Sequence, residues 1–239
     1  MTLFELKKDE SVAIIEMKNG ENRQNLDFAN GMNQLFDEIL SDNDIFSIIV
    51  TSSDEKNFSQ GVDIEWLMKK FEEKDFDSIK AFMYAMNNVF KRLLLMPVPV
   101  IAAINGHAFG NGAMLSCACD FRLMKKDRGY FCFPEVDINI PFLPGMVAFV
   151  RKAMPEYKFN EYKLTGKKVG AQELFDHHII EKASADKDEL MSDALEFAKQ
   201  FKKGRNIFGE HKKRMYKGIV EVMETQDPEF IDSLNLFVS

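Results

Sequence analysis

The sequence has few cysteines and no disulfide pattern. It contains three cysteines in 239 residues, and an odd number does not suit a disulfide framework. Cys117 and Cys119 are separated by a single residue, which is not the C-x-x-C spacing of a metal or redox site. Cys132, like the other two, lies in an apolar stretch. We therefore expect three buried thiols in a reducing compartment.

Signals for export and for membrane insertion are also missing. No stretch approaches 18 uninterrupted apolar residues, which a membrane-spanning helix would need. The start, Met-Thr-Leu-Phe-Glu-Leu-Lys-Lys, lacks the apolar region of a signal peptide. The final Leu-Phe-Val-Ser is not the Ser-Lys-Leu of peroxisomal proteins. These features predict a cytoplasmic protein with no membrane partner.

The charge balance is acidic, with a formal net charge of −7. A nucleic-acid partner would require a concentrated basic face, and none is evident, so we expect no nucleic acid. Basic residues do gather between Lys202 and Lys217. Two interpretations of this cluster stay open, a solvated helix face and a specific anion contact.

The hydrophobic pattern predicts an α/β fold. Hydrophobic residues make up 46% of the chain, an ordinary value for a globular protein. The expected elements in the first half are strands at Leu3–Leu6, Val12–Met17, Ser47–Thr51 and Val100–Ile104, with helices over 27–41 and 76–95. Strands that alternate with helices in this way favour a sheet with crossover helices.

The second half has a glycine-rich turn at 105–112, which we expect to lead into a buried helix over Ala113–Cys119. The pattern also predicts two strands joined by a turn, Phe121–Met124 and Tyr130–Phe133. Beyond about residue 160 the pattern becomes helical, and Glu189–Phe201 is the clearest helix.

The glycine-rich turn predicts an anion site, because the N–H groups at a helix N-terminus are unpaired and the helix dipole is positive there. The sequence has neither the Gly-Lys-Ser/Thr of a Walker loop nor G-x-G-x-x-G. A second turn, Phe58–Ile64, follows another strand, and Asp63 there is a plausible helix N-cap. Two such turns can each aim one N–H at a common oxygen and form an oxyanion hole, worth about 3 kcal/mol per donor.

Three stretches together resemble the crotonase superfamily of enoyl-CoA hydratases and isomerases, namely Phe58–Ile64, Ile101–Asp120 and Phe133–Pro144. The run from Leu123 to Tyr130 and the Pro-Glu-Val-Asp-Ile after it look closest to monofunctional Δ3,Δ2-enoyl-CoA isomerases. The resemblance implies a ββα spiral core over residues 1–198, a C-terminal helical trimerisation region over 199–239, and a homotrimer or a dimer of trimers.

The resemblance also implies the site residues. Glu135 would be the catalytic base, and the oxyanion donors would be the backbone N–H groups of Val62 and Asn111. The implied substrate-binding residues are Gln24, Gln60, Gly61, Val62, Asp63, Ile64, Gly110, Asn111, Met114 and Pro134. The substrate would be an acyl-CoA thioester, with the nucleotide along the 22–26 and 60–64 loops. Neither a metal nor a separate cofactor is expected, because coenzyme A is part of the substrate.

Met114 decides the expected activity within the family. Hydratases of the family use two glutamates, which would align with Met114 and Glu135. Methionine cannot activate water, whereas moving a double bond needs one base and an oxyanion hole. We therefore predict a Δ3,Δ2-enoyl-CoA isomerase. The alternatives are an enoyl-CoA hydratase or another CoA-thioester enzyme of this fold, and a catalytically silent acyl-CoA-binding protein.

Other residues are weaker candidates. Asp137 is the reserve base. His107 is expected to be hydrogen-bonded and structural. His177 and His178 make a poor metal site, and His178 stands where the family usually has glycine, which predicts a left-handed backbone. A last expectation concerns assembly: a neighbouring subunit would cover the apolar face of Leu190, Ala194, Phe197, Ala198 and Phe201.

Overall fold

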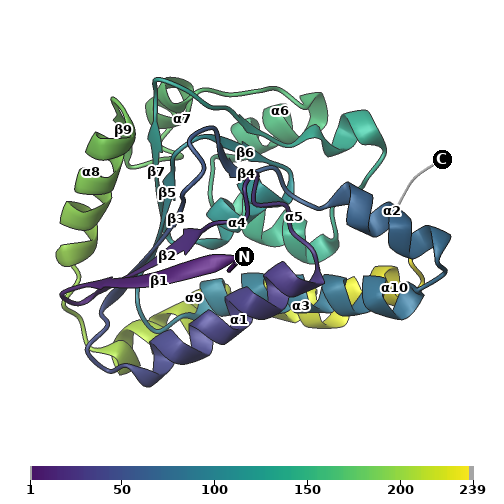
Figure 1. Ribbon diagram of the computed structural model, residues 1–239, viewed down its shortest axis with the longest axis horizontal. Coiled ribbons are helices and arrows are strands. Elements are labelled where there is room, and N and C mark those ends of the chain that lie inside the picture. Colours follow the sequence, from purple (N-terminus) through teal and green to yellow (C-terminus); the bar gives the residue numbers. More distant parts are fainter. Residues whose placement is uncertain (1, 237–239) are drawn as a thin grey trace.

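The computed structural model describes residues 2–236 and is built around a six-stranded sheet (Figure 1). The strand order is β1-β2-β3-β5-β7-β9. β1 and β2 are antiparallel and the other neighbours are parallel. The strands are β1 (Phe4–Asp9), β2 (Val12–Met17), β3 (Ser47–Ser52), β5 (Val100–Ile104), β7 (Phe121–Lys125) and β9 (Lys182–Ser184). β3 and β5 are buried along their whole length, which explains why they are nearly continuous apolar runs.

A second, smaller sheet has three short parallel strands in the order β4-β6-β8. These strands are β4 (Asn57–Ser59), β6 (His107–Phe109) and β8 (Phe131–Cys132). Three times the chain adds a strand to the large sheet, then one to the small sheet, and then enters a helix. This repeated ββα turn is the predicted spiral, and the predicted α/β class is confirmed.

The helices pack mainly on one side of the large sheet. They are α1 (Leu26–Ser41), α2 (Ile64–Glu72), α3 (Phe76–Leu95), α4 (Asn111–Ala118), the 3-10 helix η1 (Pro134–Ile138), α5 (Pro144–Arg151), α6 (Glu156–Thr165), α7 (Ala171–Asp176), α8 (Lys187–Lys199), α9 (Arg205–Thr225) and α10 (Asp227–Asp232). Figure 1 shows α8 on the opposite side of this sheet. Among residues 2–236, no helix is long and apolar enough to cross a membrane.

The apolar face of α8 is covered by the chain itself, which corrects one expectation. Leu190, Ala194 and Ala198 are fully buried and pack against large-sheet residues such as Ile49 and Ile101. Phe197 and Phe201, expected on the same face, contact Phe121 of β7. This face therefore gives no reason to expect a neighbouring subunit. The expected homotrimer or dimer of trimers remains a prediction.

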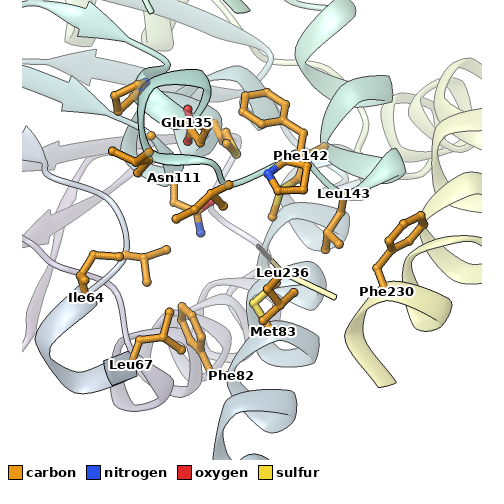
Figure 2. A pocket seen from close by; sticks show the side chains of 18 of the residues that line it. Ile64, Leu67, Phe82, Met83, Asn111, Glu135, Phe142, Leu143, Phe230 and Leu236 are labelled. Atoms are coloured by element: carbon orange, nitrogen blue, oxygen red, sulfur yellow. The ribbon is translucent and has the colours of Figure 1, made fainter. Parts of the chain in front are cut away.

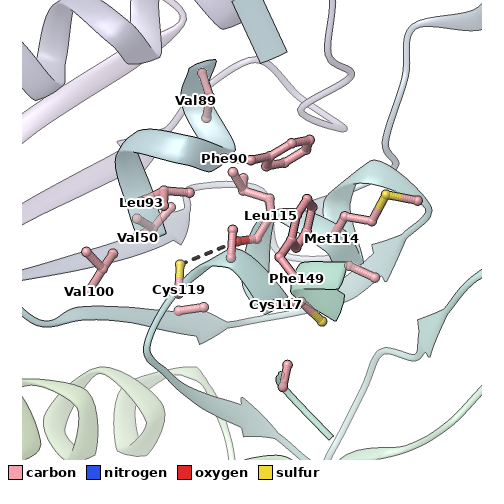
Figure 3. Close-up of a cluster of buried hydrophobic side chains, with 14 of the residues drawn as sticks. Val50, Val89, Phe90, Leu93, Val100, Met114, Leu115, Cys117, Cys119 and Phe149 are labelled. Carbon is pink, nitrogen blue, oxygen red and sulfur yellow. Dashed lines mark hydrogen bonds between the residues drawn. The ribbon is translucent and has the colours of Figure 1, made fainter. Parts of the chain in front are cut away.

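The predicted buried helix is α4, which lies in the middle of the main core (Figure 3). Every residue of α4 is buried. All three cysteines are free and buried, as expected. Cys119 donates a weak bond to the carbonyl of Leu115 at 3.4 Å, and burial raises its pKa to about 12.

Two local predictions were incomplete. The 105–112 stretch contains strand β6 as well as turns. The strands expected at 121–124 and 130–133 form, but they belong to different sheets, because β7 pairs with β5 and β9 while β8 pairs with β6.

Candidate active site

A single cavity gathers most of the predicted site residues, and its walls are largely apolar (Figure 2). Its lining comprises Arg23, Gln60, Val62, Ile64, Leu67, Phe82, Met83, Gly110, Asn111, Met114, Pro134, Glu135, Ile138, Ile140, Pro141, Phe142, Leu143, Met146, Phe230, Asn235 and Leu236. Glu135 and Asn111 lie at one end, and Leu67, Phe82 and Leu236 lie at the other. An apolar cavity with a few polar groups at one end suits a ligand with a polar head and an alkyl chain.

The two glycine turns meet at the polar end of this cavity. Gly61 precedes Val62 with a φ of +80°, and Gly110 precedes Asn111 with a φ of +53°. A Cβ atom on Gly61 would lie 3.1 Å from the backbone nitrogen of Asn111. A side chain at position 61 would therefore cover this N–H, and glycine leaves it accessible.

Both predicted donor N–H groups are unpaired for identifiable reasons. Asn111 is the first residue of α4, so its N–H has no intrahelical partner. Beside Val62, the backbone N–H of Gln24 donates to the carbonyl of Gly61, and the backbone N–H of Asp63 donates to the carbonyl of Gln24, both at 2.8 Å. This parallel pairing uses the N–H groups on either side and leaves the N–H of Val62 without a partner there. Within residues 2–236, neither N–H donates a hydrogen bond, and both residues line the cavity.

Glu135 brings a buried carboxyl to the same end of the cavity. Its side chain is mostly buried, and its Oε2 atom has no hydrogen-bond partner among the described residues. A Cβ atom on Gly110 would lie 3.0 Å from its Oε1, so the carboxyl lies beside the start of α4. Burial raises the pKa of Glu135 to about 7, against an opposing effect of the Lys163 amine.

Backbone contacts hold Glu135 in place. Pro134 begins η1, and the N–H groups of Asn139 and Ile140 both donate to the carbonyl of Glu135. Asn139 has a left-handed backbone, with a φ of +57°, which asparagine tolerates better than most residues. The chain thus turns back immediately after the base.

Met114 lies one turn into α4 and faces the cavity with a buried side chain. Among the described residues, Glu135 is the only carboxylate that lines the cavity. Asp137, the reserve base, is exposed and does not line it. Its carboxylate lies instead close to Gly166, at the end of α6.

Eight of the predicted residues line the cavity, namely Gln60, Val62, Ile64, Gly110, Asn111, Met114, Pro134 and Glu135. Three others, Gln24, Gly61 and Asp63, do not line it. Gly61 and Asp63 flank Val62 in the chain, and Gln24 pairs with Val62 through a β-bridge. Gln24 is buried and donates to Ser59 Oγ at 3.2 Å. Asp63 caps α2 by accepting from the N–H of Trp66 at 3.1 Å, as its sequence position predicted.

The sequence did not identify the distant wall of the cavity. Phe82 and Met83 lie in the helix expected over 76–95, and in the sequence an apolar helix residue looks the same whether it meets a core or a pocket. Phe230 and Leu236 come from the end of the chain, and no local signal marks them as lining residues.

His107 and His178 match their expectations. Nδ1 of His107 accepts from the N–H of Tyr130 at 3.3 Å, which agrees with the expected structural role. His178 has the predicted left-handed backbone, with a φ of +55°. Among residues 2–236, no three His, Cys, Asp or Glu side chains are grouped so that they could hold a metal ion.

The fold has close counterparts among solved structures. An enoyl-CoA hydratase/isomerase family protein from Pseudomonas syringae superposes with a TM-score of 0.85 at 22% identity, covering 96% of this chain and 97% of that one. An enoyl-CoA hydratase from Bacillus halodurans also gives 0.85, at 19% identity, covering 97% and 94%. At these identities the likeness defines the class of fold.

Sequence comparison then places the chain within that class. Residues 7–231 match the family model for enoyl-CoA hydratase/isomerase, and the chain belongs to this family. It is 31% identical over 172 residues to the peroxisomal enoyl-CoA delta isomerase 2 of Arabidopsis thaliana, covering 71% of this chain and 72% of that protein. It is 29% identical to the short-chain-enoyl-CoA hydratase of Clostridium acetobutylicum, covering 81% and 72%.

Proposed function

We propose that this protein is a Δ3,Δ2-enoyl-CoA isomerase that serves the oxidation of unsaturated fatty acids. One observation carries the proposal: among the described residues, Glu135 is the only carboxylate that lines the cavity, and apolar Met114 lines it as well. By resemblance, Met114 stands where hydratases of the family have their second glutamate. Water addition requires one group to activate the water and another to handle the carbon-bound proton. Moving a double bond requires one proton acceptor that later becomes the donor.

In the proposed reaction, the N–H groups of Val62 and Asn111 donate to the thioester oxygen of a 3-enoyl-CoA. The Glu135 carboxylate removes a proton from C2, and the electrons move to the oxygen to form a dienolate. Protonated Glu135 then returns the proton at C4, which leaves the double bond between C2 and C3. This double-bond shift consumes no water and requires no metal or redox cofactor.

The environment of Glu135 supports this cycle. A pKa of about 7 makes the carboxylate a stronger base than an exposed glutamate, and leaves its acid form accessible at neutral pH. Each oxyanion donor is expected to contribute about 3 kcal/mol to the dienolate-like transition state. The N-terminal dipole of α4 acts in the same direction.

Coenzyme A recognition would rest on the 22–26 and 60–64 loops, which meet through the Gln24–Val62 bridge. Arg23 lines the cavity from the first of these loops, and Gln60 from the second. We expect calorimetry to show much tighter binding of an acyl-CoA than of the corresponding free fatty acid. Equal affinities would contradict the proposal.

The decisive experiment supplies the protein with a 3-enoyl-CoA and, in parallel, a 2-enoyl-CoA. Formation of the conjugated 2-enoyl product and loss of it by hydration are followed separately. Isomerisation that greatly exceeds hydration would support the proposal. Hydration at a comparable rate would indicate a hydratase, and acyl-CoA binding without turnover would indicate a silent binding protein.

A further inference from the structure

The segment from Phe230 to Leu236 contributes to the wall of the cavity opposite Glu135. Phe230 of α10 and Leu236 beyond it line the cavity together with Leu67 of α2 and Met83 of α3. In Figure 2, Leu236 lies beside Met83, across the cavity from Glu135 and Asn111. An alkyl chain that extends from a thioester held at the polar end would run towards this wall.

Leu236 reaches the cavity through a strained turn. Leu234, just past α10, has a φ of +53°, which is unusual for a leucine. The turn is closed by the N–H of Leu234, which donates to the carbonyl of Ile231 at 3.2 Å, and by that of Leu236, which donates to the carbonyl of Leu234 at 2.8 Å. Such strain persists only where surrounding contacts hold it.

Those contacts are apolar and come from the first third of the chain. Leu236 is 7% exposed and forms a small buried cluster with Leu67 and Ile79. Leu234 packs at the edge of the same cluster. Leu236 thus packs against α2 and α3, and its side chain forms part of the cavity lining.

α10 is anchored, so this wall is held in position. The Asp227 carboxylate is fully buried and accepts from the N–H of Gly145 at 2.7 Å and from Asn87 Nδ2 at 2.8 Å. At the other end of α10, the Tyr84 hydroxyl donates to the Asp232 carboxylate at 2.9 Å. α3 and α5 therefore fix the helix from which the terminal turn starts.

From these contacts we propose that Leu236 is the residue that limits the length of the acyl chain. The inference rests on the proposed function, because it takes an acyl-CoA as the ligand. Each methylene that the pocket buries tightens binding about fourfold, corresponding to about 0.8 kcal/mol. The gain stops where the alkyl chain meets the Leu236 side chain, because interiors this tightly packed accept extra volume poorly.

The test measures binding of saturated acyl-CoA thioesters of increasing chain length by calorimetry, and isomerisation of the matching 3-enoyl-CoA series. For Leu236→Ala, the affinity for the longest chains should rise about fourfold for each methylene that enters the freed space. For Leu236→Phe, the preferred chain should become shorter. Met215→Ala, which changes an exposed side chain of α9, should leave the length profile unchanged.

Opposite shifts in the two Leu236 variants support the inference, and the same length profile in both variants and the wild type overturns it. Thermal unfolding followed by circular dichroism identifies a variant that fails to fold, in which case the other variant decides. The proposed function fails separately: absence of isomerisation at every chain length refutes the isomerase, while the binding profile still tests Leu236.

Discussion

Glu135 and Asp137 are two residues apart in η1, yet their carboxyls lie in different environments. Glu135 is buried against the start of α4, whereas Asp137 is exposed near the end of α6. A 3-10 helix has about three residues per turn, so residues two apart point in different directions. This separation makes Glu135 the base of the proposed reaction and excludes Asp137 from the cavity wall.

We expect Glu135→Gln to lower kcat for isomerisation by roughly 10²–10⁴-fold, the usual loss for a general base. The amide keeps the shape of the carboxylate but cannot accept the C2 proton, so acyl-CoA affinity should change little. Asp137→Asn is the matched control and should keep nearly full activity. A Glu135→Gln variant that retains most of its rate would exclude Glu135 as the base.

The pKa of Glu135 also predicts the pH dependence of the reaction. Since the carboxylate form is the base, kcat/KM should rise with pH through about 7 and level off above it. Steady-state rates measured between about pH 5 and 9 test this expectation. A rate that is already constant from pH 5 would mean that the carboxyl titrates like an exposed one.

The same burial should make the charged form of Glu135 destabilise the folded protein. A folded-state pKa near 7, against an ordinary 4.5, favours the protonated form. The stability that this preference supplies is present below pH 4.5 and lost as pH rises through 7. Glu135→Gln should thus be more stable than the wild type at pH 8, by at most about 3 kcal/mol. Urea unfolding should show this advantage disappearing near pH 4, and an advantage equal at both pH values would contradict the explanation.

At the scale of elements, α10 depends on Asp227, which joins it to α5 and α3. Removing this side chain leaves the buried N–H of Gly145 and the amide of Asn87 without partners. Asparagine at this position could still accept from Gly145. The Oδ1 of Asn87 has no partner within the described residues, and it could accept from the new amide if the Asn87 side chain turned over.

We therefore expect Asp227→Ala to lower the free energy of unfolding by about 1–3 kcal/mol, as is usual for unsatisfied buried groups. Asp227→Asn should cost clearly less, and burial, which raises the pKa of Asp227, already disfavours its charge. Urea unfolding of both variants measures the difference. Equal losses would show that the charge, not the hydrogen bonding, holds α10.

At the scale of the whole molecule, assembly is the open prediction. The α8 face packs on the chain's own sheet, but Val136 and Ile138 of η1 and Leu164 of α6 remain exposed, the last by 69%. η1 and α6 are in contact, and a Cβ atom on Gly166, two residues beyond Leu164, would lie 3.5 Å from Val136 Cγ1. Exposed apolar groups of this kind often mark subunit contacts.

We expect light scattering to show a trimer or a dimer of trimers at micromolar concentration. Leu164→Glu should shift the protein towards smaller species, because a neighbour would have to bury the new charge. Lys213→Glu, on α9, is a charge-changing control that should leave the assembly intact. A fully active monomer in the wild type would refute the prediction.

The sequence by itself determined the parts of the protein that rest on local patterns. The long helices α1 and α3 were predictable because their apolar periodicity spans many residues. The buried strands β3 and β5 were predictable because each is a short, nearly continuous apolar run. The two glycine turns, the Asp63 cap and Glu135 could be named because turn chemistry and family motifs are short and contiguous. Strands β4 and β6 were missed because three residues carry no recognisable period.

Only the tertiary structure decided what closes the cavity and what covers α8. Leu190 of α8 and Leu236 are both buried apolar residues, yet one packs on the chain's own sheet and the other enters the cavity wall. Nothing in the neighbouring residues distinguishes these two positions. Hydrophobic burial has no direction, so the partner of an apolar side chain is set by which distant segments the fold brings to it.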